Sequence, residues 1–430
     1  MIKYTVTEYE TKSGSKGLIV SVPDAPVVST NFCFRAGYRY ALDYEHKSQV
    51  AHVLEHIMAG MTSKYPSPKE FDAVFTKNGA YSNAFTSPRD LRYVSSCADF
   101  EWDRIMDLMI EEICHPYFSE KYFQSELGNV RSELTGYLSQ PGRMLGSTVA
   151  KQMGFIIKTY PEYLESLDNI TLDDVKAHWR HTHTAKNMRY VIAGDFEDKA
   201  KLQQLKDKLN SFDLPTGERF GDLADGDFHS APAVVIERED TPGINFNFFM
   251  EVKREYNDAD DNAIDALNHI LNGTMSSRIY GQAREQGLLY GCSSGCSSGK
   301  YSAEWYFGGR ANNDKLPTVF DLIVKELQRV KDGDISESEL DDAKSYALGK
   351  FQMGLQTAGQ LANFLSGRYF YDGTIKKYED GPAQIKAVTV DQMVKLANEY
   401  FDANIWSMGL WGTTDQTMGN KLQEKLSQLF

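Results

Sequence analysis

The chain has 430 residues and a formal net charge of -14 at pH 7. This length exceeds what one hydrophobic core usually serves, so two or three domains are expected. The acidity argues against nucleic acid and anionic membrane surfaces as partners, and no apolar run approaches the roughly 18 residues that a membrane span needs. The N-terminal stretch has no apolar signal core, and the five cysteines are scattered, so we expect a cytoplasmic protein.

The first half of the sequence predicts strands that alternate with helices. The residue pattern predicts strands over 3–9, 17–22, 28–39, 80–86, 90–98 and 187–194. It predicts helices over 48–60, 67–78 and 197–210, and mostly helical structure from 101 to 183. The helix at 67–78 has a clear start and stop, because Ser67-Pro68 opens it and Asn78-Gly79 ends it.

The predicted helix at 48–60 contains the pattern H-x-x-E-H, formed by His52, Glu55 and His56. Residues four apart lie on one helix face, so the two imidazoles can reach one ion while Glu55 projects beside them. The pattern is the inverted form of the zinc-peptidase motif H-E-x-x-H. The alternative is an amphipathic core helix whose histidines are hydrogen-bonded and whose glutamate faces water.

A catalytic zinc site needs a third protein ligand from another element. Glu126 and Glu133 are the candidates, on a helix predicted over 119–139. They share a helix face, but their backbones are about 10 Å apart, so one ion cannot easily take both. We expect one to be a ligand and the other to orient a ligand. The alternative is the solvated acidic face of an ordinary helix.

The second half of the chain repeats the order of the first. A Gly-, Pro- and Asp-rich linker ends the first half. Beyond it the strand at 244–256 echoes the one at 30–40, and aligning the halves pairs His269 with His56. Asp265 and Asn268 then stand where His52 and Glu55 stand, so only the first half can carry the H-x-x-E-H chemistry. The predicted domains are 1–212 with the metal site, a linker at 213–232, and a homologous domain at 233–430.

Several motifs resemble the pitrilysin/insulinase family of inverted-motif zinc peptidases. They are the H-x-x-E-H helix with Glu133 downstream, the segment AYSNAFTSPRDLRYV (80–94), and the segment MSSRIYGQAREQGLLYGCSS (275–294). The resemblance covers nearly the whole chain and is closest to the short two-domain members, including subunits similar to mitochondrial processing peptidase. One departure is Gln49, three residues before His52, where family members usually have glycine.

The resemblance implies a role for each site residue. Zn²⁺ would be held by His52, His56 and Glu133, with Glu55 as general base and Glu126 as the orienting carboxylate. Asn83 and Ala84 would lie on the strand edge that binds substrate. Arg284 and Tyr290, from the second domain, would stabilise the oxyanion. The spacing from Arg284 to Tyr290 is shorter than the family's, so Arg278 remains a competitor for the arginine role.

The expected fold is α+β, with two homologous domains that each have a mostly antiparallel sheet covered by helices. The resemblance implies that they enclose a chamber on dimerisation, in a homodimer or in a heterodimer with a related chain. The expected function is zinc-dependent endopeptidase cleavage of peptides or unfolded segments inside that chamber. The alternative is a non-catalytic scaffold or peptide-binding subunit of a related heterodimer. The complete motif favours the enzyme.

Overall fold

The computed structural model describes residues 2–239 and 241–430, and these form two compact units. Unit 1 consists of Met1–Thr135, Pro161–Leu223 and Gln352–Lys377, and unit 2 of Gly136–Tyr160, Ala224–Phe351 and Tyr378–Phe430. The units differ from the expected domains by an exchange of segments. Residues 136–160 of the first half belong to unit 2, and residues 352–377 of the second half belong to unit 1.

The sheet of unit 1 has six strands in the order β1-β2-β6-β3-β5-β4. All neighbouring strands pair antiparallel except β2 and β6, which are parallel. The strands are β1 (Thr5–Glu10), β2 (Lys16–Ser21), β3 (Val27–Phe34), β4 (Tyr81–Thr86), β5 (Leu91–Ala98) and β6 (Met188–Gly194). Because β4 ends the order, one of its backbone edges has no strand partner in the sheet.

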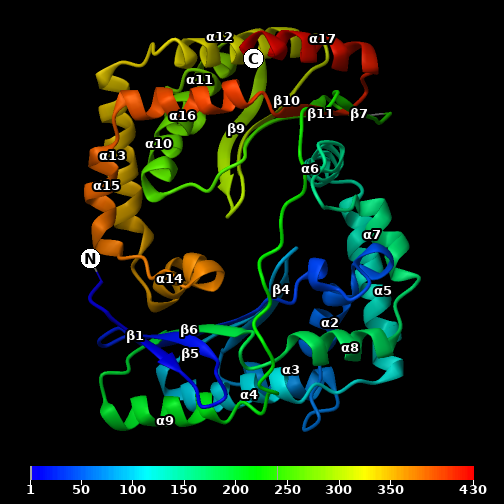
Figure 1. Cartoon of the computed structure of the whole chain (residues 1–430), viewed down its shortest axis with the longest axis vertical. Helices are drawn as coiled ribbons and strands as arrows, with labels where there is room; N and C mark the ends of the chain where they lie inside the picture. The colour runs from blue at the N-terminus through cyan, green and yellow to red at the C-terminus, as the bar shows by residue number, and fades with distance from the viewer. Residues whose placement is uncertain (1, 240) are drawn as a thin grey trace. The chain divides into compact units, whose positions relative to one another are not determined.

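Helices surround this sheet, and one of them comes from the exchanged segment. The α-helices of unit 1 are α1 (Tyr44–Lys47), α2 (Val50–Met58), α3 (Pro68–Thr76), α4 (Trp102–Cys114), α5 (Glu120–Tyr137), α7 (Tyr160–Leu167), α8 (Leu172–Thr182), α9 (Lys199–Asn210) and α14 (Ala358–Asp372). Helix α14 packs on β3 and β6, where Leu361, Leu365 and Tyr369 share an apolar core with Leu18 and Val191. Figure 1 shows α14, in orange, beside the sheet of unit 1.

Unit 2 has a five-stranded sheet in the order β7-β11-β8-β10-β9. Its strands are β7 (Val234–Glu237), β8 (Ile244–Val252), β9 (Leu289–Ser298), β10 (Ala303–Ala311) and β11 (Trp406–Gly412). Again a single neighbouring pair, β7 with β11, is parallel and the others are antiparallel. Both sheets are therefore mixed and mostly antiparallel, as predicted.

The helices of unit 2 cover its sheet in a matching way. They are α6 (Pro141–Gln152), α10 (Asp258–Asn268), a π-helix at His269–Gly273, α11 (Tyr280–Glu285), α12 (Leu316–Lys331), α13 (Glu337–Gly354), α15 (Gly381–Ala387), α16 (Val390–Ala403) and α17 (Gln416–Leu426). Helix α6, from the other exchanged segment, packs on β8 and β11 and brings Val149 against Val234 and Phe249. Each unit thus completes its core with a helix encoded in the other half of the chain.

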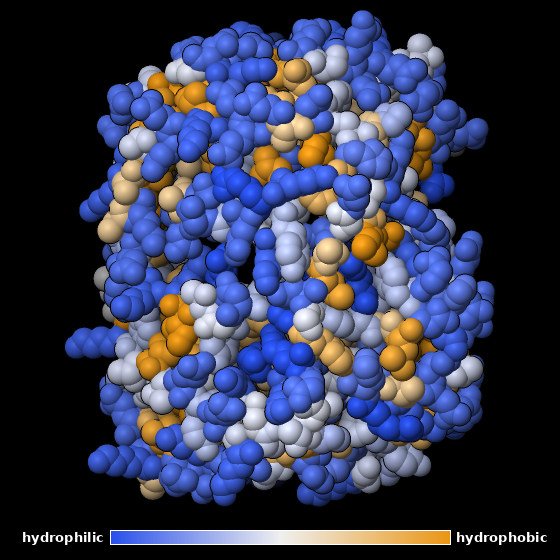
Figure 2. All heavy atoms as spheres, in the orientation of Figure 1, coloured by the Kyte–Doolittle hydropathy of each residue, from blue (hydrophilic) through white to orange (hydrophobic). Residues whose placement is uncertain are grey.

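One face of the molecule is mainly polar. On the face drawn in Figure 2, hydrophilic residues cover most of the surface and apolar residues lie in small separate groups. Within residues 2–239 and 241–430, no helix is long and apolar enough to cross a membrane.

Candidate metal centre

Helix α2 holds the H-x-x-E-H pattern rigidly because its other face is buried. Val53, Leu54 and Ile57 are at most 1 % exposed, which fixes the rotation of the helix against the core of unit 1. His52 and His56 lie one turn apart on the remaining face, with ring centroids 5.0 Å apart and ring planes at 70°. Both rings are partly exposed, so they can meet a ligand from outside the core.

Three side chains converge on one point beside α2. The Oε2 atom of Glu133, on α5, lies 3.6 Å from Nε2 of His52 and 3.5 Å from Nε2 of His56. Ligand atoms about 2.0–2.2 Å from a tetrahedral zinc ion are about 3.3–3.6 Å apart, so both distances to Glu133 suit zinc. Among the described residues this is the one group of three His, Cys, Asp or Glu side chains close enough to hold a metal ion.

The far nitrogen of each imidazole is fixed by a hydrogen bond. The Nδ1–H of His52 donates to Oε1 of Gln49 at 3.0 Å, and the Nδ1–H of His56 donates to Oε2 of Glu126 at 3.1 Å. With Nδ1 protonated, each ring turns an unprotonated Nε2 toward Glu133, which is the form that binds a metal. The two nitrogens and the carboxylate oxygen are therefore ligand types that zinc takes, and they lie within 4.8 Å of one another.

Glu126 is held by neighbours of its own. The amide of Asn129, one turn along α5, donates to the same Oε2 at 3.1 Å. Tyr122 also hydrogen-bonds Glu126, and burial together with this carboxylate raises the pKa of the phenol. The phenol fits against the end of α2 because residue 60 is glycine, where a Cβ would lie 1.7 Å from the Tyr122 oxygen. Glu126 thus lies behind His56, against its Nδ1, whereas Glu133 lies beside the Nε2 atoms of both imidazoles.

Glu55 lies on the same helix but outside the group of three metal-binding candidates. The hydroxyl of Thr86, at the end of β4, donates to its Oε2 at 2.5 Å. This bond ties the carboxylate to the edge strand and leaves Oε1 available for proton transfer. The arrangement suits a general base that stands beside a metal ion without binding it.

Strand β4 brings Asn83 and Ala84 close to the centre, because α2 packs against this strand. Asn83 is exposed, and its side-chain oxygen accepts from the backbone N–H of Ala84 at 3.0 Å. The side chain of Ala84 is only 5 % exposed, so any contact with a peptide would be through its backbone. The open edge of β4 can accept an added strand.

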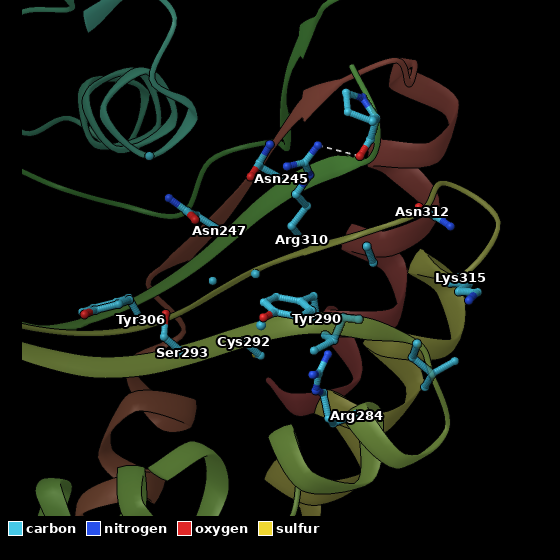
Figure 3. A pocket seen from close by; sticks show the side chains of 18 of the residues that line it. Asn245, Asn247, Arg284, Tyr290, Cys292, Ser293, Tyr306, Arg310, Asn312 and Lys315 are labelled. Atoms are coloured by element: carbon cyan, nitrogen blue, oxygen red, sulfur yellow. Dashed lines mark hydrogen bonds between the residues drawn. The ribbon is translucent and has the colours of Figure 1, made fainter. Parts of the chain in front are cut away.

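Arg284 and Tyr290 lie together in unit 2, as the predicted pairing requires. The guanidinium carbon of Arg284 is 4.3 Å from the centre of the Tyr290 ring, and Tyr290 is 80 % exposed. Figure 3 shows both in a groove over β9 and β10, with a volume of about 1160 Å³. Arg278, the competitor, is 6 % exposed and is held by two hydrogen bonds of 2.6 Å to Glu339, so Arg284 is the arginine that pairs with Tyr290.

Two family models match the sequence of this chain. Residues 18–156, which contain His52, Glu55, His56 and Glu133, match the family described as Insulinase (Peptidase family M16). Residues 169–346 match the Peptidase M16 inactive domain. The chain belongs to the insulinase family, M16. The suspected family is thereby confirmed, and this chain's H-x-x-E-H helix lies within the segment that matches the Insulinase (Peptidase family M16) model.

The relatives include proteins named as zinc proteases and others named as inactive or as non-peptidase. The chain is 22% identical over 406 residues to the uncharacterized zinc protease YmxG of Bacillus subtilis, covering 92% of this chain and 96% of that protein. It is 23% identical over 414 residues to the zinc protease PqqE of Helicobacter pylori, covering 92% and 90%. The non-peptidase homolog YmxG of Helicobacter pylori is 25% identical over 214 residues, covering 49% and 48%.

A solved structure supports the fold. The crystal structure of a protease from Helicobacter pylori superposes with a TM-score of 0.82 at 21% identity, covering 96% of this chain and 100% of that one. At this identity the similarity shows a shared fold.

The sequence analysis assigned no role to two residues of the metal centre, Gln49 and Thr86. Gln49 was noted only as a departure from the family pattern, yet it orients His52. Its spacing of three residues before His52 on one helix was the available signal. Thr86 belongs to the strand segment that resembles the family, but its contact with Glu55 depends on how β4 packs beside α2.

Proposed function

We propose that this M16 family chain is a zinc-dependent endopeptidase. The observation that carries the proposal is the convergence of His52, His56 and Glu133, with both imidazoles oriented from behind by Gln49 and Glu126. An amphipathic core helix has no need for two imidazoles whose free nitrogens face one carboxylate from another helix. The relatives named as zinc proteases add support.

The residues of the centre have separate tasks in the proposed mechanism. His52, His56 and Glu133 would hold the zinc ion, which supplies Lewis-acid activation of water and of the scissile carbonyl. Glu55 takes a proton from the attacking water at Oε1 and delivers it to the nitrogen of the leaving amine. The hydroxyl of Thr86 holds the other oxygen of Glu55 in place during both transfers.

Substrate binding follows from the free edge of β4. A peptide that adds as a further strand gains backbone hydrogen bonds with little demand on its sequence. We propose that the segment around Asn83 and Ala84 is this edge. We also propose that Arg284 and Tyr290 donate hydrogen bonds to the oxyanion, and that the chain acts as a dimer, with itself or with a related chain, that encloses its substrate.

Zinc analysis and peptide cleavage test the proposal together. Purified protein should contain about one zinc per chain and should cleave a quenched fluorescent peptide, with activity lost on chelation. Glu55→Gln should keep the zinc and lose the cleavage, whereas Glu70→Gln, an exposed glutamate on α3, should change neither. A wild type without zinc, or a Glu55→Gln variant that cleaves normally, contradicts the mechanism. Light scattering tests the dimer, since a fully active monomer would exclude it.

The second candidate is a non-catalytic peptide-binding or scaffold subunit. The observation that favours it is the relative named as a non-peptidase, which aligns with about half of this chain. Such a subunit would bind an unfolded peptide without cleaving it, with or without zinc. Cleavage that needs a second, related chain and that persists when this chain carries Glu55→Gln would point to this role. Peptide binding measured on Glu55→Gln separates binding from catalysis in both cases.

A further inference from the structure

Unit 2 contains a cavity of about 510 Å³ around the counterparts of the metal ligands. Asp265 and His269, which align with His52 and His56, both line it, and so does Asn268, which aligns with Glu55. These three residues come from the end of α10 and the start of the π-helix, and α13 supplies Lys344 and Tyr346 to the same cavity. The volume is in the range of small-molecule sites.

The chemistry of this cavity does not suit a metal ion. The described residues offer no group of three metal-binding side chains here. The ring of His269 stacks on that of Tyr346, with the two ring centroids 4.2 Å apart. Burial also lowers the pKa of His269. The aligned positions in unit 2 therefore lack the set of three metal-binding side chains found in unit 1, but they line a cavity.

Polar side chains of the cavity wall have no partner within the chain. Asn272, in the π-helix, is only 8 % exposed, and neither its amide nitrogen nor its amide oxygen has a hydrogen bond among the described residues. The amide nitrogen of Asn268 and the hydroxyl of Ser294 are also buried and have no hydrogen-bond partner among the described residues. Buried polar groups are nearly always hydrogen-bonded, so several such atoms in the wall of one hollow leave hydrogen-bonding capacity that the described residues do not satisfy. The π-helix itself is a local irregularity that is frequent at functional sites.

The cavity also contains opposite charges on different elements. Asp265 on α10 lies at the solvent-exposed rim of the cavity and makes no hydrogen bond or ion pair with another described residue. Partial desolvation of its carboxyl group, together with nearby Asp261, raises its pKa to about 6. Lys344 and Lys350 on α13 likewise make no ion pair within the described ranges. The rest of the lining is largely apolar, with alanines and Phe351, Ile385 and Val388.

We propose that this cavity, the unit 2 cavity, binds a small zwitterion with an apolar side chain, of the size of a dipeptide. The carboxylate of Asp265 binds the amino group, and the ammonium groups of Lys344 and Lys350 bind the carboxylate. The amides of Asn268 and Asn272 satisfy the remaining polar atoms of the ligand. A zwitterion can form charge-assisted hydrogen bonds with both signs of charge that line the cavity, whereas an anion or a cation alone can pair with only one of them.

Calorimetric titration of alanyl-leucine into the full-length Glu55→Gln variant tests the proposal without cleavage of the probe. We expect saturable binding that weakens by about tenfold or more when the amino group is acetylated or the carboxylate is amidated, since each change removes a charge-assisted hydrogen bond. Asp265→Asn, which preserves shape, should remove the difference between the free and the acetylated dipeptide. Lys344→Met with Lys350→Met should remove the difference between the acid and the amide.

A His52→Ala variant separates this site from the metal centre. Binding that survives His52→Ala and responds to Asp265→Asn supports the unit 2 cavity, whether or not the chain is a peptidase. Binding lost in His52→Ala and kept in Asp265→Asn would place the dipeptide at the metal centre and overturn the proposal. No saturable binding, or equal binding of free and blocked dipeptides, would also overturn it. Thermal unfolding of each variant checks that the fold is kept.

Discussion

Exchanging the two glutamates of α5 for glutamine should produce effects of different size, because they face opposite sides of the same imidazole. Oε2 of Glu126 lies 3.1 Å from Nδ1 of His56, whereas Oε2 of Glu133 lies 3.5 Å from its Nε2. Glu126→Gln removes the negative charge beside Nδ1 of His56 but keeps an amide oxygen that can accept the hydrogen bond from its Nδ1–H. Loss of such an orienting partner weakens metal binding about 10- to 100-fold, or about 1.4–2.7 kcal/mol.

Glu133→Gln should weaken zinc binding more than this, because the site then has only two ligands of full strength. The affinity is measured by competition with a chromogenic zinc chelator at a fixed pH, since the ligands must be deprotonated. Glu120→Gln, at the exposed start of α5, is the control and should leave the affinity unchanged. Equal losses for Glu126→Gln and Glu133→Gln, or the reverse order, would refute the assignment of ligand and orienting residue.

Three further changes test other parts of the structure. Thr86→Val should lower kcat about 10- to 100-fold with zinc content unchanged, because it removes a hydrogen bond to the Glu55 carboxylate worth about 1.5–3 kcal/mol. Tyr290→Phe should lower kcat about 100-fold and leave the unfolding free energy unchanged, since the residue is 80 % exposed. Glu251→Gln should stabilise unit 2 above neutral pH, because burial and the neighbouring Glu304 raise the pKa of Glu251 to about 10.

The sign of the last effect follows from proton binding. Between the ordinary pKa of 4.5 and the raised value the folded state binds more protons than the unfolded state, so stability is greatest below this window and falls as pH rises through it. The slope is at most about 1.4 kcal/mol per pH unit for each proton. Urea unfolding at a series of pH values from acidic to alkaline measures this slope of the unfolding free energy for the wild type and for Glu251→Gln. Glu424→Gln, an exposed control, should retain the wild-type slope, and a Glu251→Gln slope equal to it would contradict the reasoning.

Matched variants are also available for the two kinetic predictions. Thr86→Ser keeps a hydroxyl and should retain most of the activity, so an equal loss in the serine and valine variants would show that packing rather than the hydrogen bond matters. For Tyr290, the phenylalanine variant keeps the ring over Arg284 and removes only the hydroxyl. An unchanged kcat for Tyr290→Phe would remove it from the proposed mechanism.

The sequence by itself determined the local features of this protein. Helical spacing placed His52 and His56 on one face, and the alternation of residues gave most strands within one or two positions. The repeat showed that one half lacks the motif, because Asp265 and Asn268 stand in the aligned positions. These properties depend on neighbours along the chain, so sequence periodicity is enough to reveal them.

Only the tertiary structure decided which distant residues meet. It brought Glu133 to the free nitrogens of both imidazoles. It also packed β4 against α2, so that the hydroxyl of Thr86 donates a hydrogen bond to Glu55. It also packed α6, from the first half of the chain, on the sheet of unit 2. In the same way it packed α14, from the second half, on the sheet of unit 1. A helix pattern tells which face is apolar, but not which sheet that face will cover, because any apolar surface of suitable shape can bury it.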